Sequence, residues 1–167
     1  MTDTSQTIVT ADLYDAHHDI VQVCTLQFRS FGRRTSFCGP CETLRVFQDH
    51  TPVLAAVVEP GRGRVLVVDA GGELKIGVMG DRIAGKAQEN GWSGVVINGA
   101  VRDTMGLNAI DIGVKALGAT ARRSWVPASS SRGQELNFGG TRFRAGDWIY
   151  ADLDAVIVSN EPLTIGR

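Results

Sequence analysis

The chain has 167 residues, enough to bury a hydrophobic core without disulfides, and its 43% hydrophobic and 21% charged residues are an ordinary globular balance. The formal net charge of −1 at pH 7 excludes the strongly basic surface typical of direct nucleic-acid binding. Three cysteines, an odd number, exclude a disulfide framework. Residues 1–20 are polar and no apolar run could span a bilayer, so we expect one cytoplasmic domain over residues 1–167 with no membrane partner.

Capping residues mark two short helices in the N-terminal part of the chain. Thr10, with acids in the turn that follows, predicts a helix over residues 10–16, and the segment before Thr10 is expected to fray. The Gly- and Ser-punctuated residues 29–39 predict a loop, and the alternating residues 43–47 predict a strand with one solvated face. A Thr-Pro pair then predicts a helix over residues 53–58.

The middle of the chain predicts a strand–helix–strand unit. Residues 64–69 are an apolar, β-branched run typical of a buried strand, and residues 74–78 predict a second strand. Residues 81–90 predict a helix with one apolar face, and residues 94–98 predict the next buried strand. Because a crossover through a helix favours parallel pairing, we expect a βαβ unit at the centre of the fold.

Short strands follow to the end of the chain. Gly139 and Gly140 lie between two of them and predict a hairpin turn, whereas the Ser-rich residues 127–133 predict a loop. The fold class we expect is α/β, as a single mixed domain with a central βαβ unit and antiparallel β additions. The predicted strands cover residues 114–117, 135–138, 141–143, 148–151 and 155–158.

The start of the helix at Asp81, directly after Gly80, is a candidate binding site. The N–H groups of a first helical turn lack partners inside the helix, and the macrodipole adds partial positive charge there. Such a helix end can bind a substrate carboxylate. Asp81 therefore has two interpretations that can coexist, as a cap of its own helix or as a contact with substrate.

Arg102 and Asp103 follow the predicted strand over residues 94–98, at the position where open α/β sheets bind their ligands. Arg102 offers planar, bidentate donors for a carboxylate or an enolate. Asp103 offers a hard oxygen to Mg²⁺ or Mn²⁺, and Mg²⁺ in proteins keeps several waters with only one or two carboxylates. The alternative is a surface Arg–Asp ion pair without a ligand.

Segments that keep their order and spacing over nearly the whole chain resemble a known family. This family joins the RraA-like regulators of ribonuclease E activity with the class II, divalent-metal-dependent 4-hydroxy-4-methyl-2-oxoglutarate aldolases. The resemblance implies their swivelling β/β/α fold. The segments that carry it are residues 28–32, 63–69, 80–84, 91–103, 111–118, 138–140 and 146–152.

The resemblance implies roles for the candidate residues. Gly80, Asp81, Arg82, Ile83 and Arg102 would contact the substrate, a small 2-keto acid, and Asp103 would hold the divalent metal. The same resemblance implies a homotrimer, or a hexamer built from two trimers, with active sites at subunit interfaces. Members that act only as ribonuclease regulators can lack the acidic residue after the Arg, and this chain keeps Asp103.

The reaction implied by the resemblance is aldol cleavage of 4-hydroxy-4-methyl-2-oxoglutarate into two pyruvates. Oxaloacetate decarboxylation is an expected side activity, because both reactions pass through a pyruvate enolate. Arg102 would stabilise the enolate, and Asp81 or a carboxylate of a neighbouring subunit would accept the proton of the 4-hydroxyl group. The alternative function is a non-catalytic protein that inhibits a ribonuclease by binding to it.

Other polar residues carry weaker signals. Cys38 and Cys41 form a C-x-x-C pattern, which is typical of thioredoxin-like redox sites or of half a zinc site, but the residues around them lack the strand-then-helix context of such motifs. The doublet at Arg122 and Arg123 and the lone His50 are expected to be solvated.

Overall fold

The computed structural model describes residues 7–165. The first residues, 1–6, lie outside the described range, and most of the segment expected to fray before Thr10 lies there. The helices are α1 (Thr10–His17), α2 (Thr51–Val57), α3 (Asp81–Glu89) and α4 (Thr104–Leu107). The strands are β1 (Gln22–Val23), β2 (Arg29–Phe31), β3 (Phe37–Arg45), β4 (Val65–Asp69), β5 (Gly94–Val101), β6 (Gly113–Ala119), β7 (Ser131–Arg132), β8 (Leu136–Phe138), β9 (Thr141–Phe143), β10 (Trp148–Ala151) and β11 (Val156–Ser159).

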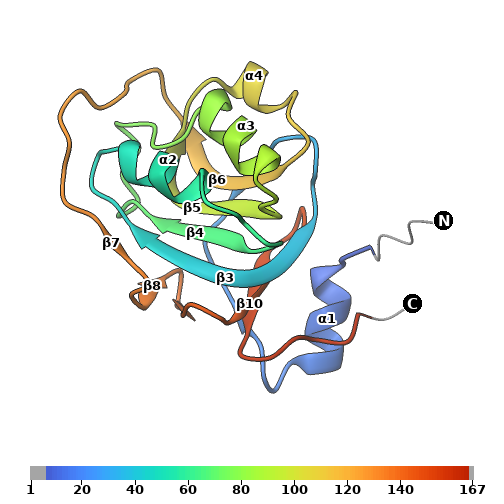
Figure 1. Ribbon diagram of the computed structural model, residues 1–167. Coiled ribbons are helices and arrows are strands. Elements are labelled where there is room, and N and C mark those ends of the chain that lie inside the picture. Colours follow the sequence, from blue (N-terminus) through green and yellow to red (C-terminus); the bar gives the residue numbers. More distant parts are fainter. Residues whose placement is uncertain (1–6, 166–167) are drawn as a thin grey trace.

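A curled, nine-stranded mixed sheet forms the centre of the fold, in the order β1-β11-β10-β3-β4-β5-β6-β2, with β7 paired to β3 off this path. Strands β3, β4, β5 and β6 are parallel to one another, and antiparallel strands extend the sheet on both sides. Helices α2, α3 and α4 lie over one face, whereas α1 lies apart beside the β10–β11 end (Figure 1). The predicted mixed α/β architecture is confirmed.

The predicted βαβ unit exists, but its first strand is β4 and not residues 74–78. That segment contributes only an isolated bridge between Gly77 and Ala100. The reason is that β4 already pairs with β3 on one side and β5 on the other, so residues 74–78 find no free strand edge beside it. Gly71 and Gly72, with φ of +69° and +72°, turn the chain out of the sheet directly after β4.

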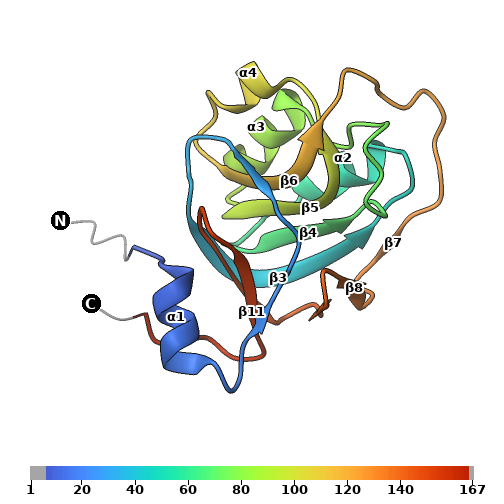
Figure 2. The same cartoon turned by 180° about the vertical axis from the view of Figure 1, so that it is seen from behind.

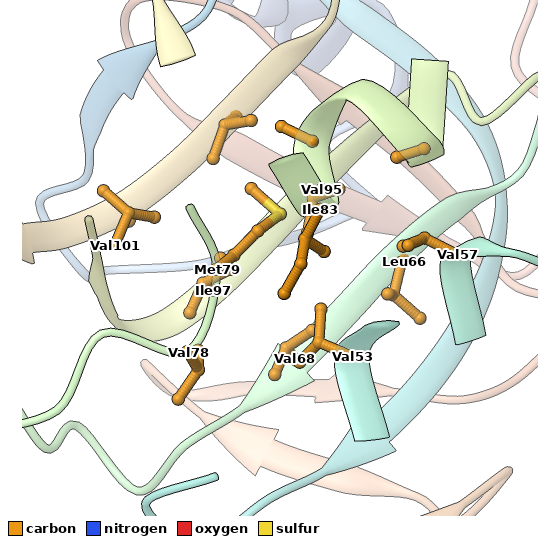
Figure 3. Packing of buried hydrophobic residues seen from close by; sticks show 14 of the residues in the cluster. Val53, Val57, Leu66, Val68, Val78, Met79, Ile83, Val95, Ile97 and Val101 are labelled. Atoms are coloured by element: carbon orange, nitrogen blue, oxygen red, sulfur yellow. The ribbon is translucent and has the colours of Figure 1, made fainter. Parts of the chain in front are cut away.

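The largest hydrophobic cluster lies between the parallel strands and the helices (Figure 3). Val53 and Val57 of α2 and Ile83 of α3 pack with side chains of β4 and β5. Val78 and Met79, which are 1% and 0% exposed, belong to the same cluster and fix the segment that leads into α3. The start of α3 therefore sits on a closely packed core, which holds the chain rigidly at Gly80.

A second cluster fills the other face of the sheet, where the β8–β9 hairpin, β10 and β11 enclose it (Figures 1 and 2). All eight residues of β5 and the first four of β4 are buried, so both strands are covered on both faces. The predicted hairpin at Gly139 and Gly140 is confirmed, with φ of +59° and +68°, the left-handed values that its tight turn requires.

Two N-terminal predictions need correction. Of residues 29–39 only 32–36 form a loop, because β2 pairs with β6 and the first residues of β3 pair with β10, partners that lie far away in the sequence. Thr10 is the first residue of α1 rather than its cap. The carboxylate of Asp152 takes the capping role, since it accepts hydrogen bonds from the Thr10 N–H and Oγ1, both at 2.7 Å.

Candidate functional site

A pocket with a volume of about 260 Å³ opens at the carboxyl end of the parallel strands, where α2 and α3 both begin. Four segments line it: the start of α2, the residues around the start of α3, the turn after β5 and the loop after β6. Ligands bind at this edge in open α/β sheets, because the connections there leave crevices between strand ends and helix starts. The lining residues are His50, Leu54, Gly77, Gly80, Asp81, Arg82, Ile83, Lys86, Arg102, Asp103 and Arg123.

Every site residue predicted from the sequence lies in this pocket. Gly80 precedes α3 as its N-cap, and Ala84 is the residue whose N–H bonds back to the Gly80 carbonyl, at 3.1 Å. The amides of the first turn, from Asp81 to Ile83, therefore precede the helical hydrogen-bond ladder, as in other helices that bind anions. The helix start faces a pocket of metabolite size.

Asp81 does not cap its own helix. It is the first helical residue, and no side chain forms a capping hydrogen bond at Gly80. Its carboxylate instead lies against the backbone of α4, because a Cβ built on Gly106 would overlap Asp81 Oδ2. The Asp81 side chain forms no hydrogen bond or ion pair with another described residue, so its carboxylate is free to contact a ligand in the pocket.

Arg102 is anchored through its backbone and leaves its guanidinium uncommitted. Its N–H donates to the Met79 carbonyl at 2.8 Å, and its Cγ lies where a Cβ of Gly77 would be. Its Nε is buried without a partner among residues 7–165. A guanidinium in this state is ready to bind an anion, because a buried donor left unpaired costs free energy that a ligand oxygen recovers.

Asp103 has a special backbone and an exposed side chain. Its φ of +57° and ψ of +47° are left-handed, a conformation that Asp tolerates better than most residues, and it forms the N-cap of α4. A Cβ added to Gly80 would lie only 2.5 Å from Asp103 Oδ2, so the carboxylate rests on the bare backbone at the start of α3. No ion pair joins it to Arg102 within the described chain, which argues against the surface-pair alternative.

The pocket is cationic overall. Four Arg and Lys side chains line it against two carboxylates, those of Asp81 and Asp103, and His50 is also present. A concave site with this excess of positive charge concentrates anionic ligands. Of its basic residues only Lys86 has an ion-pair partner in the described chain, Glu89 at 3.3 Å on the exposed side of α3.

Part of the pocket lining was not predicted from the sequence. His50 and Arg123 were expected to be solvated, yet both lie in the pocket with Leu54 and Lys86. Only the topology brings them there: α2 and the loop after β6 both start from the carboxyl edge of the sheet. Each of these two residues follows a predicted strand, but this position alone does not show that their segments meet at one pocket.

The C-x-x-C pattern is not a redox or zinc site. Cys38 and Cys41 lie three residues apart within β3, and side chains at this spacing point to opposite faces of a strand. Cys41 is buried in the second cluster, whereas Cys38 packs beside Tyr150 in a third one. Burial raises the pKa of both thiols, which keeps them protonated and unreactive. No group of three or more His, Cys, Asp or Glu side chains suited to a metal is found in residues 7–165.

Comparison with known proteins identifies the family. The RraA-like family, described as Aldolase/RraA, matches residues 10–158. The chain belongs to the RraA-like family. A relative from Alkalilimnicola ehrlichii, provisionally named 4-hydroxy-4-methyl-2-oxoglutarate aldolase, is 43% identical over 156 residues, which cover 93% of this chain and 97% of that protein. A protein of the same provisional name from Cupriavidus taiwanensis is 41% identical over 160 residues and equally well covered.

Solved structures of other proteins share the fold of this chain. The RNA-processing inhibitor RraA from Thermus thermophilus has a TM-score of 0.90 and 37% identity, with 96% of this chain and 98% of that chain covered. A Geobacillus kaustophilus protein named S-adenosylmethionine: 2-dimethylmenaquinone methyltransferase has a TM-score of 0.91 and 40% identity, with coverage of 96% and 99%. The names given to these relatives span an aldolase, an inhibitor and a methyltransferase. No helix in residues 7–165 is long and apolar enough to cross a membrane.

Proposed function

We propose that this RraA-like protein is a cytoplasmic, divalent-metal-dependent lyase that cleaves 4-hydroxy-4-methyl-2-oxoglutarate into two pyruvates and also decarboxylates oxaloacetate. The observation that carries the proposal is the convergence of the α3 start, Arg102 and Asp103 on one small cationic pocket. The aldolase names of relatives more than 40% identical support it. The pocket volume of about 260 Å³ suits a small acid, because it is slightly below the roughly 300–1,000 Å³ of typical ligand pockets.

The residues of the pocket fit a Mg²⁺ or Mn²⁺ ion. Asp103 presents an exposed hard oxygen over Gly80, where the missing Cβ leaves room, and Arg102 does not neutralise it. One protein carboxylate with waters and substrate oxygens is a normal shell for these ions, whereas zinc prefers His and Cys ligands. When bound, the ion would supply Lewis-acid polarisation of the 2-keto and carboxylate oxygens of the substrate.

The protein residues then divide the remaining work. The amides of Asp81 to Ile83 bind the substrate carboxylate, and the Arg102 guanidinium binds the 2-keto oxygen. Asp81 accepts the proton of the 4-hydroxyl group, directly or through a water, as the C3–C4 bond breaks and C4 becomes the carbonyl of the first pyruvate. The bond electrons stay on the other fragment as an enolate, which Arg102 stabilises and which becomes the second pyruvate on protonation at C3.

Oxaloacetate is decarboxylated by the same groups. Loss of CO₂ from oxaloacetate leaves the identical pyruvate enolate, so the Arg102 contact serves both reactions. This step needs no base, because no hydroxyl proton leaves. Asp81→Asn should therefore reduce aldol cleavage far more than decarboxylation. Equal losses in both reactions would contradict the proton-accepting role of Asp81.

The decisive assay measures pyruvate release from both substrates with Mg²⁺, Mn²⁺ or EDTA, for the wild type and for Asp103→Asn. We expect turnover that requires the metal and falls at least about 100-fold in the variant, in line with the loss of a charged group at a reacting centre. Thermal unfolding should show that the variant is folded. Metal-loaded wild type that releases no pyruvate from either substrate would refute the lyase proposal.

Inhibition of a ribonuclease is the second candidate, because the RNA-processing inhibitor RraA from Thermus thermophilus shares the fold at 37% identity. An inhibitor that acts by docking would not need Asp103, so inhibition of a purified ribonuclease by the wild type and by Asp103→Asn alike would favour it. The methyltransferase name of the Geobacillus protein is a poorer guide, since a pocket of about 260 Å³ is small for S-adenosylmethionine and a quinone together.

We also propose assembly as a homotrimer, alone or doubled to a hexamer. Three large apolar side chains near the pocket, those of Met105, Trp125 and Val126, expose 90%, 80% and 74% of their surface, which is typical of interface residues. Light scattering of the purified protein measures the mass directly, and a monomer at micromolar concentration would contradict the proposal.

A further inference from the structure

We infer that His50 and Arg123 form a second anion subsite in the pocket, one that binds the distal carboxylate of a 2-keto dicarboxylate. The inference rests on the proposed function, since it assigns the 2-keto end of the substrate to the α3 start, Arg102 and Asp103. It adds the residues that would distinguish a dicarboxylate from a monocarboxylate of the same length. Both residues line the pocket from elements that hold none of the groups assigned so far.

His50 presents one available ring nitrogen. Its Nδ1 is buried without a partner among the described residues, whereas its Nε2 forms no hydrogen bond there and is not enclosed. Because a buried N–H without an acceptor is costly, Nε2 is the ring nitrogen suited to carry the proton that a ligand oxygen accepts. His50 therefore offers a donor on its accessible side.

Arg123 presents the ends of its guanidinium. Its Nε donates to the Ser124 carbonyl at 3.2 Å, and its Cζ lies 4.2 Å from the centre of the Trp125 ring. These contacts hold the plane of the side chain but leave the terminal nitrogens without an acidic partner in the described chain. An arginine that is oriented but unpaired is suited to a carboxylate, which it can bind through two parallel hydrogen bonds.

One buried carboxylate holds the two segments together. Asp49 is 2% exposed, and its Oδ1 accepts hydrogen bonds from Thr51 N at 2.9 Å and Thr51 Oγ1 at 2.8 Å, which fixes the start of α2 beside His50. Its Oδ2 accepts a 2.9 Å hydrogen bond from Ala128 N, at the end of the loop that carries Arg123. Asp49 thus joins the segment that carries His50 to the loop that carries Arg123.

The charge of the pocket supports a doubly charged ligand. Among the Arg and Lys side chains that line the pocket, Lys86 already has Glu89 as a partner, and one substrate carboxylate at the α3 start still leaves Arg123 without an acidic partner. A second carboxylate would match this remaining charge. Leu54, on the same helix as His50, adds an apolar surface of the kind that the 4-methyl group of the proposed substrate can contact.

The test compares two substrates that differ only at the distal group. These are 4-hydroxy-4-methyl-2-oxoglutarate and 4-hydroxy-4-methyl-2-oxopentanoate, in which a methyl group replaces the carboxylate and cleavage gives pyruvate and acetone. We expect Arg123→Gln and His50→Leu each to lower the ratio of kcat/KM for the dicarboxylate to kcat/KM for the monocarboxylate. The decrease should be about 10- to 100-fold, the effect of losing a charge-assisted hydrogen bond. Arg122→Gln is the matched control, because Arg122 does not line the pocket. An unchanged ratio in both variants would overturn the inference.

Binding measurements separate this inference from the proposed reaction. If the wild type cleaves neither substrate, calorimetry with 2-oxoglutarate and with 2-oxopentanoate, in which a methyl group replaces the distal carboxylate, still tests the subsite in the presence of Mg²⁺. We expect the wild type and Arg122→Gln to bind the dicarboxylate more tightly than the monocarboxylate, and Arg123→Gln to lose this preference. This result would support the subsite even if the protein is not a lyase. Equal affinity of the wild type for the two acids would overturn it. Thermal unfolding of each variant confirms that the comparison uses folded protein.

Discussion

Replacement of Gly80 by alanine tests whether the position of the Asp103 carboxylate matters for activity. A Cβ on Gly80 would lie 2.5 Å from Asp103 Oδ2, a separation that must open to at least 3.0 Å, so the carboxylate has to move by about 0.5 Å or more. Displacements of about 1 Å at a reacting centre can reduce rates about 100-fold. We therefore expect Gly80→Ala to lower kcat/KM for pyruvate release by about 10- to 100-fold.

The fold should tolerate this change. Gly80 has φ of −116° and ψ of −167°, an extended backbone that alanine adopts without strain. The atom that must yield is the end of an exposed side chain and not backbone. We expect the melting temperature to change by no more than a few degrees, because a Gly→Ala change without backbone strain alters stability by only about 0.4–1 kcal/mol.

Gly85→Ala is the matched control on the same helix. A Cβ on Gly85 meets no atom within 4 Å, and the residue does not line the pocket. This variant should gain about 0.5–1 kcal/mol of stability from helix propensity and keep wild-type turnover. Steady-state assays with Mg²⁺ and thermal unfolding of both variants make the comparison. Full activity in Gly80→Ala would refute the argument that Asp103 must hold its place on the α3 start.

Three further predictions concern the rest of the molecule. Asp152→Ala should lower the free energy of unfolding by about 0.5–2 kcal/mol in urea titrations, since Thr10 loses its capping acceptor, and an unchanged midpoint would count against that role. Burial alone would raise the pKa of the Asp49 and Asp152 carboxyls, but hydrogen bonds from backbone N–H groups outweigh it and lower both. Their stabilisation should be complete above the unfolded pKa of about 4 and decline as pH falls through the folded values, a loss that Asp49→Asn should reduce in acid thermal scans. Cys38 and Cys41 should form no disulfide with each other in oxidised, folded protein, and a mass lower by two hydrogens would contradict their opposite placement in β3.

Local signals accounted for the parts of the fold that the sequence predicted well. The apolar run of β4, the apolar face of α3 and the Gly139–Gly140 turn all carry their information within a few residues. The failures depend on distant partners. Residues 29–31 and 37–39 form strands because β6 and β10 pair with them, and residues 74–78 form none because β3 and β5 already occupy both edges of β4.

The same distinction applies to the site. Asp81, Arg102 and Asp103 could be found because a helix start and a strand end are visible in the sequence, and the structure brings them to one pocket. His50 and Arg123 could not be found in this way, because no local pattern shows that α2 and the loop after β6 meet there. The roles of all five residues stay predictions until the variants are assayed.

The burial of β4 and β5 on both faces has a consequence for folding. Runs such as Val65–Val68 and Val95–Ile97 are β-branched or apolar and uncharged, a composition that aggregates readily when it is exposed. Their parallel pairing requires closure of the long connection that contains α3, and this entropic cost slows the covering of these runs during folding. A substitution that weakens the packing of α3 would therefore lower the yield of folded protein even when it leaves the chemistry of the pocket intact.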